Sequence, residues 1–443
     1  MPNLKFEMTQ PTSSDQPNAE PLPSAEKKKT LRTGSLLVIF LTVFIDLLGF
    51  GIVLPLLPIY ADQFGTDPSG WVIGMLMASF SIMQFLFAPI WGALSDRVGR
   101  RPIIMVGLTA SVIFYTLFGI ATLWKSLPWL FITRIGAGIA GATIPTAQAY
   151  IADTTENENR ARGMALIGIA FGLGFTLGPL FAVFAVPSGD TDPGPGPGFV
   201  AAALSAVALG LAIFKLPESL TPNSETANKK QWWKMDRWKL AFSDPAIKLL
   251  LLAFFVCIFA FASFETTLSM LIKGSADFEN PPFNFTFENV CWTFALIGLL
   301  VAIVQGGIVR PLAKHVSEKY LAISGALIEV VGFALMAFAA SSASLPMLFA
   351  SLVTIVCGYA CLQPSLYSLL SRWSDPQRQG TVLGVGQSVN ALARIFGSAL
   401  GIPMLKAAFF LPFALPYVVG CGLMLSVGVF VYLAASKGTD YGS

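Results

Sequence analysis

Charged residues are scarce in this sequence. Asp, Glu, Lys and Arg make up 12% of the 443 residues, whereas a soluble domain carries about 25%. So few charges cannot cover the surface of a soluble protein of this size, and 54% of the residues are hydrophobic, with a mean hydropathy of +0.68. The composition therefore excludes an ordinary soluble protein and favours one that lies in a lipid bilayer.

Residues that carry common catalytic chemistry are rare as well. The single histidine, His315, lies in a charged loop and cannot form a zinc site alone, and the five cysteines lie in or beside apolar runs without a C-x-x-C pair. The sequence has no phosphate-binding loop and no serine or cysteine with a histidine beside it. A net charge of +3 is too small to argue for nucleic-acid binding. We therefore expect no enzyme, no cofactor, no metal site and no nucleic-acid partner.

Long apolar runs are abundant instead. A helix needs about 20 apolar residues to cross the core of a bilayer, and such runs recur along the chain with short polar or Gly/Pro breaks between them. The runs lie near residues 35–60, 71–94, 103–123, 127–151, 163–186 and 199–214, and then near 247–272, 289–310, 319–340, 345–371, 380–404 and 408–434. They predict an all-α membrane protein with twelve transmembrane helices.

The two sets of runs predict two six-helix bundles, over residues 35–214 and 247–435. We expect residues 1–34 and 436–443 to be cytoplasmic tails, the first disordered, because residues 1–34 are rich in Pro, Ser, Glu and Lys. Residues 215–246 form the expected cytoplasmic linker. Its segment 217–245 interleaves tryptophans with lysines and an arginine, which is typical of an amphipathic helix on a membrane surface.

The distribution of positive charge predicts the topology. Lysines and arginines accumulate in cytoplasmic loops, and most of the 28 in this chain fall on one side if both termini are cytoplasmic. The halves also resemble each other: Pro145 and Pro364 each lie in a small-residue helix that is followed by a polar turn with arginine and then by a glycine, Gly163 or Gly380. Such repeats are common in transporters.

A polar string joins the second and third runs. Residues 92–101 read GALSDRVGRR, in which glycines allow a tight turn and one acid lies among three arginines. The string resembles the loop signature G-x-L-x-D-R-x-G-R-R/K of the major facilitator superfamily. The resemblance implies a cytoplasmic gate whose ion pairs depend on the side to which the carrier opens. The expected gate residues are Gly92, Asp96, Arg97, Gly99, Arg100 and Arg101. The corresponding turn of the second half has Arg310 in place of the acid.

The fifth run is rich in glycine. Gly172, Gly174 and Gly178 precede Pro179, so that one helix face is flat and a kink follows. The pattern resembles the antiporter motif G-x-x-x-G-P-x-x-G-G of exporters, although Phe181 and Ala182 replace its trailing glycines. An ordinary glycine-rich membrane helix is the alternative.

Charged side chains inside apolar runs are candidates for function. A charge near the bilayer centre costs at least about 2.5 kcal/mol unless it faces a cavity or a partner. Asp46 lies in a run similar to the first helix of tetracycline efflux proteins, and we expect it to face the cavity as a proton site. Arg134 opens a segment similar to the R-x-x-x-G motif of these antiporters. Glu265 could hold a proton or a cation, Arg394 needs an unidentified partner, and we interpret Glu329 as peripheral.

Cavity linings in this superfamily come mainly from runs one, four, seven and ten, which adds polar candidates. The full expected set is Asp46, Arg134, Gln148, Glu265, Gln363, Tyr367, Asn390 and Arg394. The resemblance implies a monomeric, multi-pass transporter of the plasma (inner) membrane that exchanges protons for small amphiphilic compounds by alternating access. Two alternatives remain: an organic-anion uptake carrier or facilitator, favoured by Arg134 and Arg394, and a non-transporting receptor or scaffold on the same fold.

Overall fold

The computed structural model describes residues 33–65, 67–155, 160–187, 192–219, 244–274, 278, 281–374, 379–407 and 413–438. These residues form helices and connecting turns, without a strand. Eleven of the described helical spans are long and apolar enough to cross a membrane, and α7 (Arg160–Ala185) contains a shorter apolar stretch, Gly172–Ala185. The expected all-α membrane fold is confirmed.

The N-terminal half holds eight helical segments. They are α1 (Thr33–Val53), α2 (Leu57–Phe64), α3 (Trp71–Val98), α4 (Arg100–Leu123), α5 (Leu127–Gly141), α6 (Ile144–Thr154), α7 and α8 (Gly196–Lys215). Two of the expected runs are each divided in two. Pro55 and Pro58 lie where α1 gives way to α2, and Pro145 follows the break between α5 and α6, because proline lacks the N–H that continues a helix.

The C-terminal half holds α10 (Pro245–Lys273), α11 (Phe287–Ile303), the π-helical turn η3 (Val304–Val309), α12 (Arg310–Leu312), α13 (Glu318–Ser342), α14 (Leu345–Arg372), α15 (Gln379–Lys406) and α16 (Leu415–Ala435). Asp244 caps α10 by accepting hydrogen bonds from the N–H groups of Ala246 and Ile247. The expected tail 1–32, most of the amphipathic linker (220–243) and the end of the chain (439–443) lie outside the described residues.

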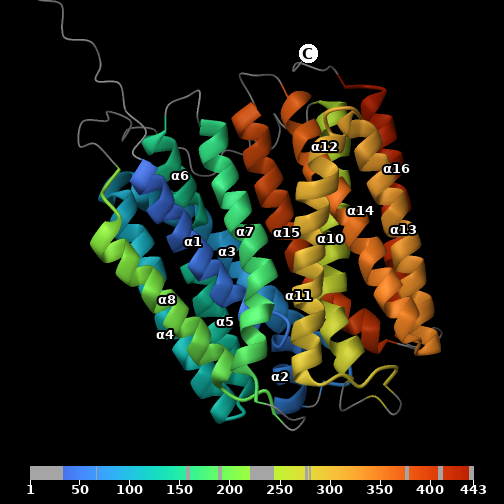
Figure 1. Cartoon of the computed structure of the whole chain (residues 1–443), viewed down its shortest axis with the longest axis horizontal. Coiled ribbons are helices and arrows are strands. Elements are labelled where there is room, and N and C mark those ends of the chain that lie inside the picture. The colour runs from blue at the N-terminus through green and yellow to red at the C-terminus, as the bar shows by residue number, and fades with distance from the viewer. Residues whose placement is uncertain are drawn as a thin grey trace, which may run out of the picture.

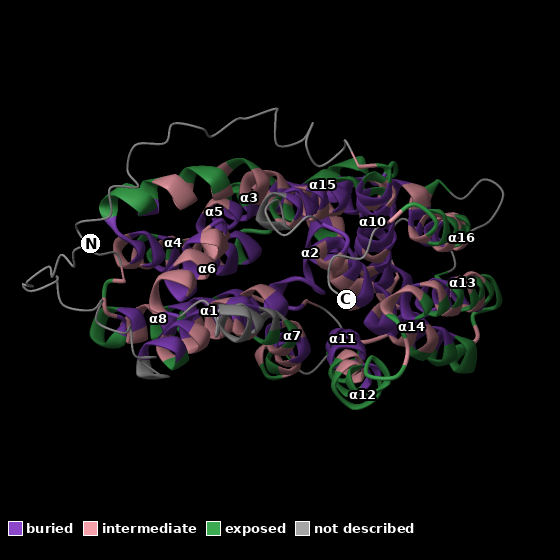
Figure 2. Cartoon of the chain, turned by 90° about the horizontal axis from the view of Figure 1, so that it is seen from above, coloured by how far each residue is buried: buried purple, intermediate pink, exposed green. Residues whose placement is uncertain are grey.

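The two halves lie side by side as two groups of helices (Figures 1 and 2). We call the end where α1 begins and α16 ends the proximal end, which is uppermost in Figure 1, and the opposite end the distal end. The proximal end is the one that the sequence predicts to be cytoplasmic. Where the halves meet, α3 packs against α15 and α7 packs against α11.

The contact between the halves is tightest at the distal end. A Cβ at Gly70, just before α3, would lie 2.8 Å from the side chain of Ile402 in α15, and one at Gly74 would meet the carbonyl oxygen of Ala399. The other helix pair between the halves, α7 and α11, converges toward the distal end and diverges toward the proximal end (Figure 1). A Cβ at Gly92 of α3 or Gly384 of α15 would have no neighbour within 4 Å. The two halves are therefore in close contact at the distal end, and α7 and α11 lie farther apart toward the proximal end.

Large apolar side chains are exposed along the outer helices, as expected of a surface that faces lipid. Exposed tryptophans gather near the distal end, where α3, α5 and α11 begin and α4 ends: Trp71, Trp124, Trp129 and Trp292. Tryptophan is enriched at the boundary between membrane and water, so this band marks the distal membrane surface.

Candidate functional site

The central feature is an ion pair between two helices of the C-terminal half. Arg394 Nη2 on α15 donates a hydrogen bond to Glu265 Oε2 on α10 at 3.0 Å, and the two side chains are 26% and 11% exposed. The guanidinium also lies over the ring of Phe175 on α7, 5.9 Å from its centroid. The pair therefore faces the other half of the molecule. The structure supplies the partner of Arg394, which the sequence left unidentified.

Arg134 is enclosed on the other side of this interface. It is 2% exposed, and its guanidinium lies 4.6 Å from the ring centroid of Phe80 and 5.6 Å from that of Phe50. Its Nε and Nη1 have no hydrogen-bond partner, and within the described chain no carboxylate pairs with it. Cation–π contacts offset only part of the cost of burying a guanidinium. Arg134 is thus a buried cation without a carboxylate partner among the described residues.

Aromatic rings connect the two arginines. Phe50 on α1 packs edge-on against Phe175, with ring centroids 5.7 Å apart, and in a tilted arrangement against Phe80 at 4.7 Å. A continuous row therefore runs from Arg134 in one half, through Phe50 and Phe175, to Arg394 in the other. Such a wall suits the flat apolar body of an amphiphilic ligand, with charged anchors at both ends.

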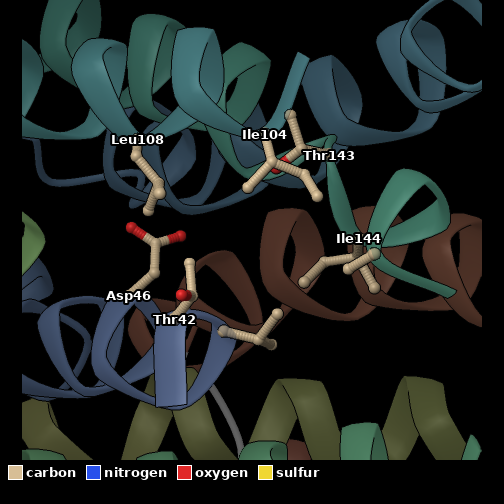
Figure 3. Close-up of a pocket in the computed structure, with 8 residues that line it drawn as sticks. Thr42, Asp46, Ile104, Leu108, Thr143 and Ile144 are labelled. Carbon is tan, nitrogen blue, oxygen red and sulfur yellow. The ribbon is translucent and has the colours of Figure 1, made fainter. Parts of the chain in front are cut away.

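Asp46 does not join this row. Its carboxylate points from α1 toward α4, into a small pocket inside the N-terminal half (Figure 3). Ser205 of α8 donates a hydrogen bond to Asp46 Oδ1 at 3.3 Å, and the pocket walls are Thr42, Val43, Asp46, Ile104, Leu108, Thr143, Ile144 and Ala147. The expectation that Asp46 faces the cavity between the halves is therefore not met in this conformation, because its position on α1 directs it to α4 and α8.

The remaining expected cavity residues lie on α6, α14 and α15. Asn390 Nδ2 donates to the Tyr367 hydroxyl at 3.2 Å, and this pair is half-buried. Gln148 and Gln363 are half-buried, but no hydrogen bond joins either amide to the central ion pair within the described residues. The structure therefore brings Glu265 and Arg394 together directly and places Asn390 one turn before Arg394 on α15.

The proximal string forms the expected charge cluster. Arg100 pairs with Asp96, donates from Nε to Asp153 on α6 at 3.1 Å, and donates to the Ser95 hydroxyl at 2.7 Å. Glu218, beyond α8, accepts from the N–H groups of Arg100 at 2.9 Å and Arg101 at 3.1 Å, so it caps the start of α4. The cluster ties α3, α4, α6 and the end of α8 together within one half.

The C-terminal half repeats this arrangement with the charges exchanged. Glu318 at the start of α13 pairs with Arg372 at the end of α14 at 3.0 Å, where the N-terminal half places Arg100 and Asp153. Ser368 also donates to Glu318 at 3.2 Å. The repeat that the sequence suggests thus extends to the ion pairs, with reversed polarity.

The glycine-rich helix α7 packs directly on α1. A Cβ at Gly178 would lie 2.6 Å from the Cα of Gly51, and one at Gly174 would lie 2.8 Å from the Cβ of Leu47. Gly172 is different, because nothing lies within 4 Å of its Cβ position. Gly174 and Gly178 therefore have a packing role, and Pro179 continues the same helix as a buried residue.

The position of Glu329 differs from the one expected from the sequence. It was expected to be peripheral, yet it is fully buried between α13 and α14, with neither carboxyl oxygen hydrogen-bonded. A Cβ at Gly358 would lie 2.8 Å from the backbone N of Glu329, and Gly325 meets the carbonyl of Gly358 in the same crossing. These glycines let the two helices approach so closely that the acid is enclosed.

Several residues of the site are not marked by any of the sequence motifs. Phe50, Phe80 and Phe175 line the central row, and Asp153 and Glu218 complete the proximal cluster. Phenylalanine occurs 36 times in this chain, so no pattern distinguishes these three. An acid at the end of a run, opposite a known arginine motif, is the signal that could have indicated Asp153.

Comparison with known proteins identifies the fold family. The family model described as Major Facilitator Superfamily matches residues 39–398. The chain belongs to the major facilitator superfamily. Tetracycline resistance protein, class C, of Escherichia coli is 30% identical over 403 residues, which cover 88% of this chain and 94% of that protein. Major facilitator superfamily domain-containing protein 10 of Bos taurus is 30% identical, over 85% of this chain and 88% of its own length.

Solved structures agree with this assignment. The human organic anion transporter MFSD10 (TETRAN) superposes with a TM-score of 0.65 at 26% identity, over 92% of this chain and all of that one. A D-xylose-proton symporter superposes with a TM-score of 0.70 at 16% identity, which supports the fold alone. This major facilitator is therefore a multi-pass membrane transporter, and it is not an enzyme.

Arg134 offers a test that separates folding from transport. Methionine matches the arginine side chain as far as Nε and removes two buried donors that lack partners. We therefore expect Arg134→Met to be more stable by about 1–3 kcal/mol and inactive in transport. Thermal unfolding in detergent and uptake into vesicles measure the two effects. A destabilised Arg134→Met would show that the guanidinium supports the fold and is not held for a ligand.

Proposed function

We propose that this major facilitator exchanges protons for small amphiphilic organic compounds by alternating access. The observation that carries the proposal is the Glu265–Arg394 pair, which faces the interface of the two halves and is still partly exposed. A carboxylate that can alternate between an arginine, a proton and a charged group of a substrate couples the binding of these partners, because only one occupies it at a time.

The close distal contact between the halves, at Gly70 and Gly74, supports alternating access. The central pair lies between the two ends, so a substrate that enters from the proximal end meets Arg394 and the aromatic row before any distal exit. The relatives support the substrate type, since one is a tetracycline resistance protein and another an organic anion transporter. We further propose that the protein is a monomer of the plasma (inner) membrane, with the proximal end and both termini in the cytoplasm.

The test is flux in vesicles with an imposed pH difference. Purified protein in proteoliposomes would be given tetracycline, an aromatic quaternary ammonium ion and an aromatic carboxylate, one at a time. Exchange predicts that vesicles with an acidic interior accumulate the compound as protons leave. Co-transport with protons predicts accumulation only in vesicles with an alkaline interior, and a facilitator responds to neither gradient.

The Glu265→Gln variant shows whether the central acid is the coupling site. We expect it to bind the compound but to lose the response to the pH difference, because an amide does not titrate. Glu318→Gln is the matched control, since Glu318 also pairs with an arginine at 3.0 Å but lies at the proximal end. Full pH-driven accumulation by Glu265→Gln would refute this role of Glu265.

An organic-anion carrier is the second candidate, and Arg134 is the observation that favours it. Its guanidinium has no carboxylate partner in the described chain, so the central row holds one more cation than Glu265 neutralises. An anionic compound that displaces Glu265 from Arg394 would leave that acid free to take a proton. Anion and proton would then move together, and the alkaline-interior vesicles would accumulate the aromatic carboxylate.

A further inference from the structure

One ion pair crosses between the halves at the distal end of the described chain. Lys406, the last residue of α15, donates from Nζ to Asp62 Oδ1 of α2 at 3.1 Å. The two side chains are only 2% and 6% exposed, which makes this the most enclosed ion pair of the described chain. Lys406 belongs to the C-terminal half and Asp62 to the N-terminal half, so the pair connects the two bundles.

Lys406 also binds the turn that begins α3. Its Nζ donates to the carbonyl oxygen of Asp67 at 2.8 Å. That turn is firmly built, because Asp67 is buried and its Oδ2 accepts from the N–H of Ile73 at 3.0 Å while Oδ1 accepts from the Ser69 hydroxyl at 2.9 Å. The ammonium group therefore joins the end of α15 to two rigid elements of the other half.

These contacts lie beside the tight crossing of α3 and α15, where Gly70 meets Ile402. When the distal end opens, the two helices must separate and Lys406 must leave both partners. Water then solvates the freed ammonium and carboxylate, and this hydration compensates for the lost ion pair. In the closed state, removal of either charge breaks an ion pair whose side chains are only 2% and 6% exposed, which is strongly unfavourable.

We propose that Lys406 is the latch that holds the distal end closed, and that its contacts with Asp62 and Asp67 set the balance between the proximally open and distally open states. The inference needs only alternating access. It does not depend on the identity of the substrate or on proton coupling, so its test can fail while the proposed exchange stands.

The experiment measures the distance between the halves at the distal end. Spin labels would be attached at Trp124→Cys and Ser342→Cys, two exposed positions at the distal ends of α4 and α13, in a full-length variant without its five native cysteines. Double electron–electron resonance in lipid nanodiscs then gives the fractions of short and long distances. The Lys406→Met variant is expected to raise the ratio of distally open to distally closed molecules at least about tenfold.

Matched variants make the result specific. Asp62→Asn should shift the distances in the same direction, and Lys406→Arg should restore the wild-type distribution. Lys125→Met is the control, because Lys125 pairs with Asp192 at 3.0 Å at the same end, but within one half and with the lysine 65% exposed. The proposal is overturned if neither Lys406→Met nor Asp62→Asn changes the distances relative to Lys125→Met.

Discussion

Replacing Arg394 by methionine is expected to lower the rate of transport about 100-fold while the protein remains folded. Arg394 is the ion-pair partner of Glu265 at the interface of the halves. Breaking a buried pair by removing one member costs about 3 kcal/mol or more in the state that contains the pair. This free energy corresponds to a factor of about 100 in the equilibrium that populates that state. Without the arginine, Glu265 has no ion pair that a substrate could break. Binding of a substrate would then no longer change the ion pairing or protonation of Glu265.

The measurement is the initial rate of accumulation in vesicles, for the compound that the wild-type protein transports. Arg372→Met is the matched control, because Arg372 pairs with Glu318 at the same distance but is more exposed and lies at the proximal end. We expect Arg372→Met to stay within about threefold of wild type, since partly exposed pairs contribute about 1 kcal/mol or less. Wild-type transport by Arg394→Met would remove the central pair from the mechanism.

Replacing Gly178 by alanine is expected to destabilise the N-terminal half by about 3 kcal/mol. The new Cβ would lie 2.6 Å from the Cα of Gly51 and 2.7 Å from its carbonyl carbon. Both are backbone atoms, which cannot rotate away as a side chain can. The helices α1 and α7 would have to separate, and overpacking of this kind costs about 1–3 kcal/mol.

The same substitution at Gly172 is the control. It lies on the same helix, less than two turns earlier, and nothing is within 4 Å of its Cβ position. Alanine there should leave stability unchanged or raise it by up to about 1 kcal/mol, because alanine favours helix over glycine. Thermal unfolding in detergent, followed by circular dichroism, gives the unfolding midpoint of each variant. Equal unfolding midpoints for the two variants would show that α1 and α7 can yield at Gly178.

The expected spans and the observed helices differ mainly at prolines. The first run was expected to continue to residue 60, but the structure ends α1 at Val53 and starts α2 at Leu57. Hydropathy cannot show this break, because Leu54 and Leu56 are as apolar inside the turn as inside a helix. The break matters for packing, since the separate helix α2 places Asp62 beside Lys406.

The charged residues show a second limit of the sequence. The free-energy cost of placing a charge in a bilayer was enough to mark four residues as candidates for function: Asp46, Arg134, Glu265 and Arg394. It could not pair them, because partners come from helices far apart in the chain: Glu265 and Arg394 are separated by 129 residues. It also could not distinguish Asp46, which faces its own bundle, from Glu265, which faces the other half.

The sequence by itself determined that this is a membrane protein with two related sets of six spans. It also determined that residues 92–101 carry the loop signature of the major facilitator superfamily. These properties follow from composition, run length and local motif, which need no long-range contact. Only the tertiary structure decided which charges meet, which end is closed, and that Arg134, Phe50, Phe175 and Arg394 form one row. The physical reason is that helix rotation and packing set the direction of each side chain, and glycines such as Gly51 and Gly178 fix that packing at distances that no local pattern records.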